Sequence, residues 1–208
     1  MICISIGSKA VIPEVNRLRP EIIELRYDLL KEPPELVDHL VDENIKRIAT
    51  CRPQNFNEEQ RLEILKQALK YGADYADVEL ESDPAFIAEI REVCNYYKAG
   101  LIISYHNFEK TPEIDELEDL LNKCYILEAD ISKLACKVSK ESDAATLLSL
   151  YKDNRSKVII GMGDRGRITR IASLFLGAPF SFAAFSREGV TAPGQYTFQE
   201  MNDLLRKL

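Results

Sequence analysis

Ionisable side chains recur at a nearly constant interval along the first two thirds of the chain. Successive members are 26, 27, 27 and 27 residues apart: Arg26, Arg52, Glu79, His106 and Lys133. Each belongs to a short run of apolar and β-branched residues, and we expect each to occupy the same level of a successive strand. Alternate residues of a strand face the same side. On four of these strands another polar residue stands two positions earlier: Glu24, Thr50, Asp77 and Ser104.

Two residues of this series have side chains suited to acid–base and covalent chemistry. His106 is one of two histidines in the chain, and histidine is the natural general base near neutral pH. A buried lysine near positive charge loses its proton more readily, so Lys133, with Arg26 and Arg52 nearby, is a candidate imine-forming nucleophile. Strands lie about 4.8 Å apart, which would place Lys133 beside His106. Lys137 has the same parity and is the competing nucleophile, although we expect it further out, near solvent.

The same pattern has a structural explanation, in which arginines and carboxylates on neighbouring strands neutralise one another in a buried network. For any single pair this explanation is favoured. For the whole series it is disfavoured, because parallel strands buried on both faces are otherwise almost entirely apolar, and a buried polar network without a ligand is costly. The series therefore indicates a binding or catalytic site.

The elements that must position these residues follow from the hydrophobic pattern. Eight candidate strands alternate with segments of helical periodicity, at residues 2–6, 22–26, 47–52, 75–80, 101–106, 131–136, 158–161 and 180–185. Such alternation predicts parallel pairing through crossover helices. We predict an α/β fold, a (β/α)8 TIM barrel forming a single compact domain over residues 1–208, with its chemistry at the carboxyl ends of the strands. The rival, an open Rossmann sheet, needs a glycine-rich turn after the first strand, where only Gly7 stands.

Two loops late in the chain are suited to holding a ligand. A glycine-rich turn at residues 161–167 opens a helix that carries Arg170. It is a weak phosphate-site signal, and a tight strand-to-helix turn explains it equally well. Residues 186–195 form a long polar loop with glycine hinges, suitable as a lid over the barrel mouth.

Composition excludes several other classes of protein. The chain has 27 basic and 34 acidic residues, a net charge of −7, and no basic stripe, so we expect no nucleic-acid and no membrane partner. No apolar run approaches the length of a membrane span, and the first residues predict a strand rather than a signal peptide. Five cysteines without a Cys-x-x-Cys pair argue against zinc and a disulfide framework. We expect a cytoplasmic protein with no metal site.

Seven motifs, in order and spanning the whole chain, make the sequence similar to the type I 3-dehydroquinate dehydratase family, Schiff-base enzymes of the shikimate pathway. They stand at residues 24–28 (ELRYD), 50–53 (TCRP), 77–80 (DVEL), 104–108 (SYHNF), 133–135 (KLA), 161–163 (GMG) with 168–170 (ITR), and 191–195 (TAPGQ). Any one of these motifs is weak, whereas their order and spacing together are specific.

The resemblance implies a role for each candidate residue. Lys133 would form an imine with the ring ketone of 3-dehydroquinate, and His106 would move the protons. The imine is itself the electron sink, so no cofactor is implied. Arg170 would bind the substrate carboxylate, to which a forked guanidinium is suited. The remaining substrate-binding candidates are Glu24, Arg26, Arg52 and Gln195, with Ser5 and Thr191 as weaker ones. A homodimer is expected at the level of the family.

One departure from the family pattern concerns the acid that orients the histidine. The family often carries a glutamate four residues after the arginine of its Thr-x-Arg motif, where this chain has Phe56. We expect Glu79, on the strand beside His106, to cover part of that role. Two alternative functions are another lysine-imine barrel enzyme, such as a class I aldolase acting on a sugar phosphate, and a non-catalytic ligand-sensing barrel.

Overall fold

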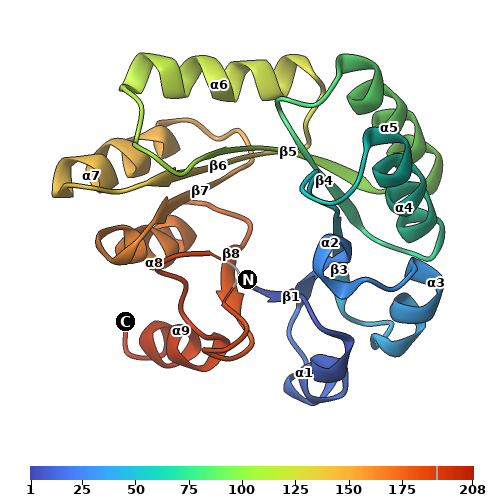
Figure 1. The fold of residues 1–208 in the computed structure, drawn as a ribbon. Helices are drawn as coiled ribbons and strands as arrows, with labels where there is room; N and C mark the ends of the chain where they lie inside the picture. Colours follow the sequence, from blue (N-terminus) through green and yellow to red (C-terminus); the bar gives the residue numbers. More distant parts are fainter. Residues whose placement is uncertain (191) are drawn as a thin grey trace.

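The computed structural model describes residues 1–190 and 192–208, and its centre is a sheet of eight parallel strands. The sheet order is β7-β6-β5-β4-β3-β2-β1-β8. The strands are β1 (Ile2–Ile6), β2 (Ile22–Arg26), β3 (Lys46–Thr50), β4 (Tyr75–Glu79), β5 (Gly100–Asn107), β6 (Ile131–Lys137), β7 (Lys157–Met162) and β8 (Ser181–Ala184). The sheet curls into a nearly closed barrel with helices around it (Figure 1), so the predicted fold class is confirmed.

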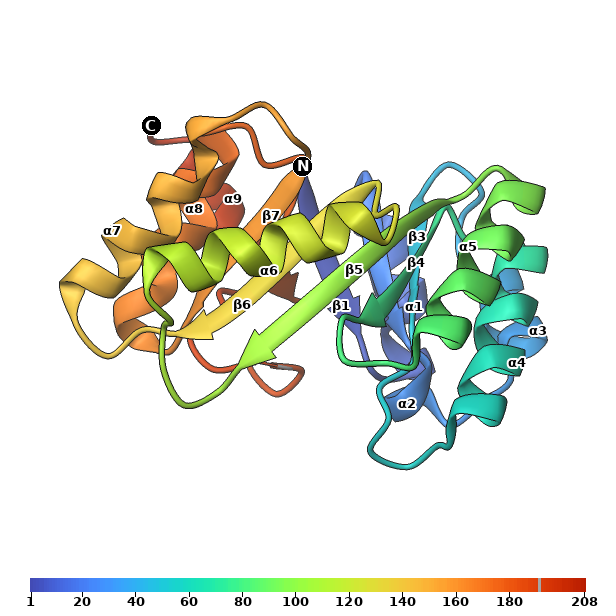
Figure 2. The same ribbon diagram turned by 90° about the horizontal axis from the view of Figure 1, so that it is seen from above.

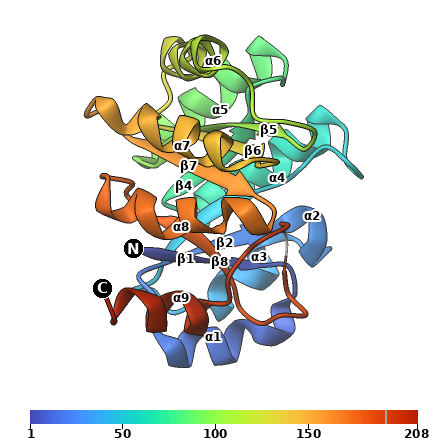
Figure 3. The same ribbon diagram turned by 90° about the vertical axis from the view of Figure 1, so that its left-hand side faces the viewer.

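Helices connect the strands and cover the outside of the barrel. The main ones are α1 (Ile12–Leu18), α4 (Glu58–Lys70), α5 (Pro84–Tyr97), α6 (Ile114–Ile126), α7 (Glu141–Ser149), α8 (Arg167–Phe175) and α9 (Phe198–Leu205). Short turns are α2 (Tyr27–Leu30), α3 (Pro34–Val37), η1 (Lys9–Val11), η2 (Asp38–Leu40), η3 (Leu150–Lys152) and η4 (Asp164–Gly166). Helix starts are set by local sequence: Asn57 and Gln60 form a capping box on α4, and Asp83 caps α5 ahead of Pro84. The two termini lie at the same end of the barrel (Figure 3).

Alternation along the strands separates an outer apolar layer from the barrel interior. The outward-facing Leu25, Cys51 and Val78 are buried in the core between strands and helices, as their parity predicts. The floor of the interior is also apolar, built from residues such as Ile48 and Phe180. The polar side chains lie above this floor. No helix in the described part of the chain has the length and apolarity needed to cross a membrane.

The strand register corrects one prediction. Ser104 pairs with Lys133, and His106 pairs with Ala135, so Lys133 lies two residues deeper in the barrel than His106. Arg26 likewise pairs with Thr50, not with Arg52. The equally spaced residues therefore do not share one level. Strands in a barrel are tilted and staggered, as the oblique course of β5 and β6 in Figure 2 shows, so equal spacing in sequence does not give equal height.

The barrel has a seam between β7 and β8. Within residues 1–190 and 192–208 no backbone ladder joins these two strands, which stand at opposite ends of the sheet order. Helix α8 covers the gap. Its Thr169 Oγ1 accepts a hydrogen bond from Gly161 N of β7 at 2.7 Å, and Arg170 Nη1 donates to Phe182 O of β8 at 3.2 Å. Two adjacent side chains of α8 thus connect the strands that do not pair with each other.

Candidate active site

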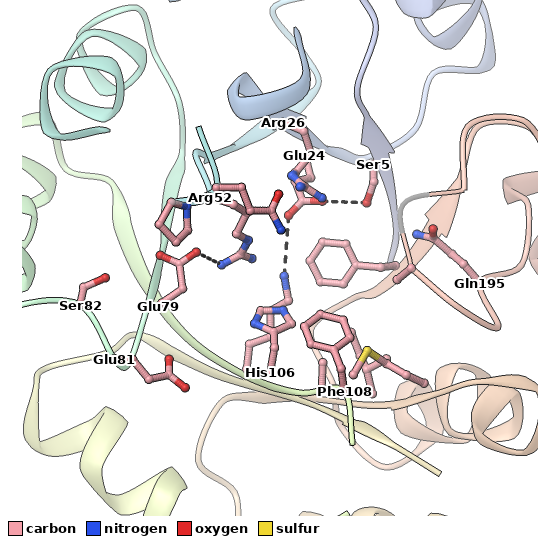
Figure 4. A pocket seen from close by; sticks show the side chains of 18 of the residues that line it. Ser5, Glu24, Arg26, Arg52, Glu79, Glu81, Ser82, His106, Phe108 and Gln195 are labelled. Carbon is pink, nitrogen blue, oxygen red and sulfur yellow. Dashed lines mark hydrogen bonds and ion pairs between the residues drawn. The ribbon is translucent and has the colours of Figure 1, made fainter. Parts of the chain in front are cut away.

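A cavity of about 480 Å³ opens at the carboxyl ends of the strands. Figure 4 shows side chains from opposite sides of the barrel converging on it. It brings together nine of the ten predicted site residues, namely Ser5, Glu24, Arg26, Arg52, Glu79, His106, Lys133, Arg170 and Gln195. The tenth, Thr191, lies outside the described residues. Lys137, the competing nucleophile, is exposed at the end of β6.

Lys133 lies at the base of the cavity and is almost fully buried. Its Nζ donates to Asp77 Oδ2 at 2.8 Å and lies 3.7 Å from Glu24 Oε1. The ring of Phe182 is 4.0 Å from Nζ. The charged groups next to the Lys133 amine are therefore carboxylates, whereas the sequence predicts arginines near it.

Asp77 is a site residue to which the sequence assigned no role beyond its place two positions before Glu79. It is fully buried, accepts a hydrogen bond from Ser104 Oγ at 2.6 Å and lies 3.2 Å from Arg52 Nη2. Burial by itself raises the pKa of a carboxyl, but Arg52 and Lys133 outweigh burial and hold the pKa of Asp77 well below its usual range. The sequence feature that marks Asp77 as a site residue is its position on the inward face of the strand, two residues before Glu79.

Glu24 is held by two hydroxyls on the neighbouring strands. Ser5 Oγ donates to its Oε2 at 2.7 Å, and Thr50 Oγ1 donates to its Oε1 at 3.0 Å. The carboxylate is thus fixed close to Lys133 Nζ. Ser5, predicted as a weak substrate ligand, therefore acts on Glu24 in this structure.

His106 lies above Lys133, nearer the mouth of the cavity. Burial lowers the pKa of its imidazole well below the ordinary value, and the charges of Arg52 and Lys133 lower it further. The ring therefore stays neutral and able to accept a proton. Its ring is stacked with that of Phe108, at 6.1 Å between centroids and 13° between planes. Among the described residues no hydrogen bond to the imidazole of His106 is formed.

The three predicted arginines are held in different ways. Arg26 binds Asp28: its Nε donates to Oδ1 at 2.9 Å, and its Nη2 donates to Oδ2 at 2.6 Å. Arg52 donates to Glu79 Oε1 at 2.6 Å. Arg170 enters from α8 at the seam, and burial lowers its pKa to about 10. Its Nε and Nη2 are buried and have no hydrogen-bond partner in the described part of the chain, so this arginine is ready to receive an anion.

Glu79 has two arginine partners. Its Oε1 accepts from Arg52, and its Oε2 is ion-paired with Arg61, a buried residue of α4 that lines the cavity and that the sequence analysis did not select. No hydrogen bond joins Glu79 to His106 in the described chain, so a role of Glu79 in orienting the histidine stays a prediction. Phe56 packs against the outer core and is not among the residues that line the cavity.

The loop after β8 packs on the glycine turn after β7. Gly163 N donates to Pro193 O at 3.1 Å, and a Cβ on Gly194 would lie 2.3 Å from Gly163 O. This packing places Ala192 and Gln195 at the cavity. The glycine turn is therefore a tight connection supporting the loop, which was the alternative to a phosphate site. Within residues 1–190 and 192–208, no three His, Cys, Asp or Glu side chains group as metal ligands would.

The fold and the cavity define a (β/α)8-barrel enzyme whose buried lysine lies beneath a neutral histidine. The model of the type I 3-dehydroquinase family matches residues 2–208. A 3-dehydroquinate dehydratase from Methanococcus maripaludis is 34% identical, covering 99% of this chain and 99% of that protein. The chain belongs to the type I 3-dehydroquinase family and is a hydro-lyase.

Solved structures agree with this assignment. The type I 3-dehydroquinate dehydratase from Clostridium difficile, crystallised with covalently modified comenic acid, superimposes with a TM-score of 0.86 at 26% identity, over 99% of this chain and 90% of that one. The enzyme from Aquifex aeolicus superimposes with a TM-score of 0.84 at 26% identity, over 100% of this chain and 98% of that one.

Proposed function

We propose that this chain dehydrates 3-dehydroquinate to 3-dehydroshikimate and water, in the shikimate route to aromatic amino acids, through an imine on Lys133. The observation that carries the proposal is the cavity itself, where Lys133 lies buried beneath His106 and Arg170 offers two unpaired donors. Membership of the type I 3-dehydroquinase family supports the same reaction.

The reaction divides into steps that the two residues perform in turn. The amine of Lys133 attacks the ring ketone and releases water, which leaves an imine. Neutral His106 takes a proton from the adjacent carbon, and the imine accepts the electron pair. His106 then gives that proton to the departing hydroxyl, which leaves as water. Hydrolysis of the imine consumes one water and frees Lys133, so the net product is 3-dehydroshikimate and one water.

The other cavity residues would bind and orient the substrate. Arg170 Nε and Nη2 are suited to the carboxylate, because a guanidinium fork binds both oxygens of a carboxylate. Polar groups for the ring hydroxyls come from Glu24, Arg26, Arg52 and Gln195. Ser5 would contribute by fixing Glu24, and Thr191 stays a candidate on the same loop as Gln195.

Borohydride trapping tests the proposal directly. Reduction during turnover of 3-dehydroquinate should convert the imine to a stable amine, inactivate the enzyme and leave an adduct that peptide mapping places on Lys133. Lys133→Ala should abolish trapping, whereas the matched variant Lys137→Ala should trap normally. An adduct on Lys137 would overturn the site assignment, and an active enzyme that cannot be trapped would overturn the imine. Activity on a sugar phosphate in place of 3-dehydroquinate would identify an aldolase, and tight binding of 3-dehydroquinate without turnover would identify a sensor.

We further propose that the protein works in the cytoplasm as a homodimer. All five cysteines are buried and unpaired, which suits a reducing compartment such as the cytoplasm.

The dimer is supported by apolar side chains on the surface of helix α8. Ile168 and Phe175 are 55% and 64% exposed and lie seven residues apart on one side of the helix, next to Leu176. Sedimentation of the purified chain should give a dimer that Phe175→Glu dissociates; a monomer at all concentrations would contradict the dimer.

A further inference from the structure

A buried arginine at the start of α4 connects that helix to the cavity. Arg61 shares the buried face of α4 with Leu65, Ala68 and Leu69, and only 2% of its side chain is exposed. A charge at such a position needs partners, because an unpaired guanidinium is expensive to bury. Two of its partners, the Cys51 carbonyl and the Glu79 carboxylate, lie at strand ends beside the active site.

Three contacts orient the Arg61 guanidinium. Its Nε donates to the carbonyl oxygen of Cys51 at 2.8 Å, and its Nη2 is ion-paired with Glu79 Oε2. Its central carbon lies 4.9 Å from the centre of the Phe86 ring, in cation–π contact. With Nε and Nη2 both bound and an aromatic ring against its face, the planar Arg61 guanidinium has little freedom to move.

These contacts lie where β3 and β4 separate. The last paired residues of the two strands are Thr50 and Asp77. Cys51 and Glu79 come just after them, so Arg61 holds the two strand ends together beyond the point where the backbone ladder stops. The residue that immediately follows Cys51 is Arg52.

From Glu79 the ion pairs continue to the nucleophile. Glu79 Oε1 accepts from Arg52 Nη1 at 2.6 Å, Arg52 Nη2 lies 3.2 Å from Asp77 Oδ1, and Asp77 Oδ2 accepts from Lys133 at 2.8 Å. Figure 4 shows the Glu79–Arg52 contact beside His106. The five charges alternate in sign from α4 to the floor of the cavity.

We propose that Arg61 is a positioning residue for Arg52: by holding the Glu79 carboxylate and the Cys51 carbonyl, it keeps the Arg52 guanidinium where it meets the substrate. The inference rests on the proposed function for the role of Arg52 as a substrate ligand. Without Arg61, Glu79 would have one free oxygen and could draw Arg52 out of place.

Steady-state kinetics of Arg61→Met and Arg61→Lys test the inference. A displaced ligand of this kind lowers kcat/KM by roughly 10- to 100-fold, and we expect the loss mainly in KM. Arg61→Lys, which keeps the charge but not the fork, should lie between Arg61→Met and the wild type. The matched control is Arg91→Met, because Arg91 is another mostly buried helix arginine, 2.6 Å from Asp130 and remote from the cavity. It should change kcat/KM by no more than about twofold, as expected for an ion pair that does not contact the site.

A double-variant cycle separates positioning from a general loss of structure. If Arg61 acts through Glu79, Arg61→Met should cost several-fold less in the Glu79→Gln background than in the wild type. The acid limb of the pH profile should also move up toward the ordinary histidine value in Arg61→Met, because a displaced Arg52 no longer repels a proton from His106. Full additivity of the two substitutions, with an unchanged pH profile, would overturn the proposal.

A crystal structure of the variant keeps this test independent of the proposed function. In Arg61→Met the Arg52 guanidinium should leave its position 3.2 Å from Asp77; an Arg52 that stays in place would overturn the positioning role whatever reaction the enzyme performs. Should Arg61→Met not fold, the same comparison applies to Arg61→Lys. A wild-type enzyme without dehydratase activity would overturn the proposed function and leave this structural result standing.

Discussion

At the scale of single residues, the site places a histidine and a lysine in contrasting surroundings. The His106 ring is stacked on that of Phe108 and has no hydrogen bond among the described residues, and burial together with Arg52 keeps it neutral. Lys133 lies lower, against Asp77 and Glu24. One group is therefore ready to accept a proton, while the other is held in place by carboxylates.

With His106 as the proposed base, its lowered pKa determines the pH below which activity should fall. Because the folded protein disfavours the imidazolium, the acid limb of kcat/KM against pH should lie well below the ordinary histidine value of about 6.5. An NMR titration of the ring, assigned with the help of His39→Gln, should show the same displacement. An acid limb at or above the ordinary value would mean that His106 is not the base.

Asp77→Asn should affect both activity and stability. The substitution leaves Lys133 and Arg52 buried without their shared counter-charge, a loss that typically costs about 3–5 kcal/mol of unfolding free energy. At temperatures where the variant is folded, kcat/KM should fall by roughly 100-fold because both cations move. Asp130→Asn, which removes a half-exposed partner of Arg91, is the control for losing a carboxylate, and equal behaviour of the two variants would refute the assignment.

At the scale of elements, the sequence predicted which strands and helices form but not how they are staggered. All eight strands were predicted, because each is a short run of apolar, aromatic or β-branched residues between helical segments. The level of each side chain depends on barrel tilt, which leaves no mark in one sequence, and this is why Lys133 and His106 were placed side by side. The burial of Arg61 can be predicted from helical spacing, because it stands four, seven and eight residues before apolar residues of the same helix face.

The loop after β8 depends on one glycine. Gly194 has φ of +73°, and a Cβ there would collide with Gly163 O, so Gly194→Ala should displace the loop that carries Gln195 and raise KM. Gly177→Ala is the control, because Gly177 has φ of +104° but open space around it. Both variants should lose about 1 kcal/mol or more of unfolding free energy. Only Gly194→Ala should bind substrate poorly. Equal KM values for the two variants would contradict a role of the loop after β8 in substrate binding.

At the scale of the whole molecule, one buried carboxyl outside the cavity makes stability depend on pH. Burial raises the pKa of Asp38 to about 6, although Tyr27 donates to it at 2.6 Å and Arg47 lies 3.7 Å away. The folded state therefore binds this proton more tightly than the unfolded state. Its contribution to stability is complete below the ordinary aspartate pKa and is lost as pH rises through about 6.

Asp38→Asn should stabilise the protein above that pH. The amide oxygen can still accept from Tyr27, while the charge that is costly to bury is gone, so unfolding in urea at pH 7.5 should require about 1–3 kcal/mol more than in the wild type. The difference should shrink toward zero at pH 4.5. A variant that is less stable than the wild type at pH 7.5 would show that the ion pair with Arg47 outweighs burial.

Because of the seam between β7 and β8, substrate binding should make the barrel wall more rigid. Seven neighbouring strand pairs are joined by backbone ladders, whereas the strands β7 and β8 themselves are connected through side chains of α8. A carboxylate bound to Arg170 would immobilise the guanidinium that also holds Phe182 O, so the ligand would complete the wall of the barrel. Saturating 3-dehydroshikimate should therefore slow amide hydrogen exchange in β8 more than in β4, which is paired on both sides; equal protection of the two strands would show that the seam is already rigid.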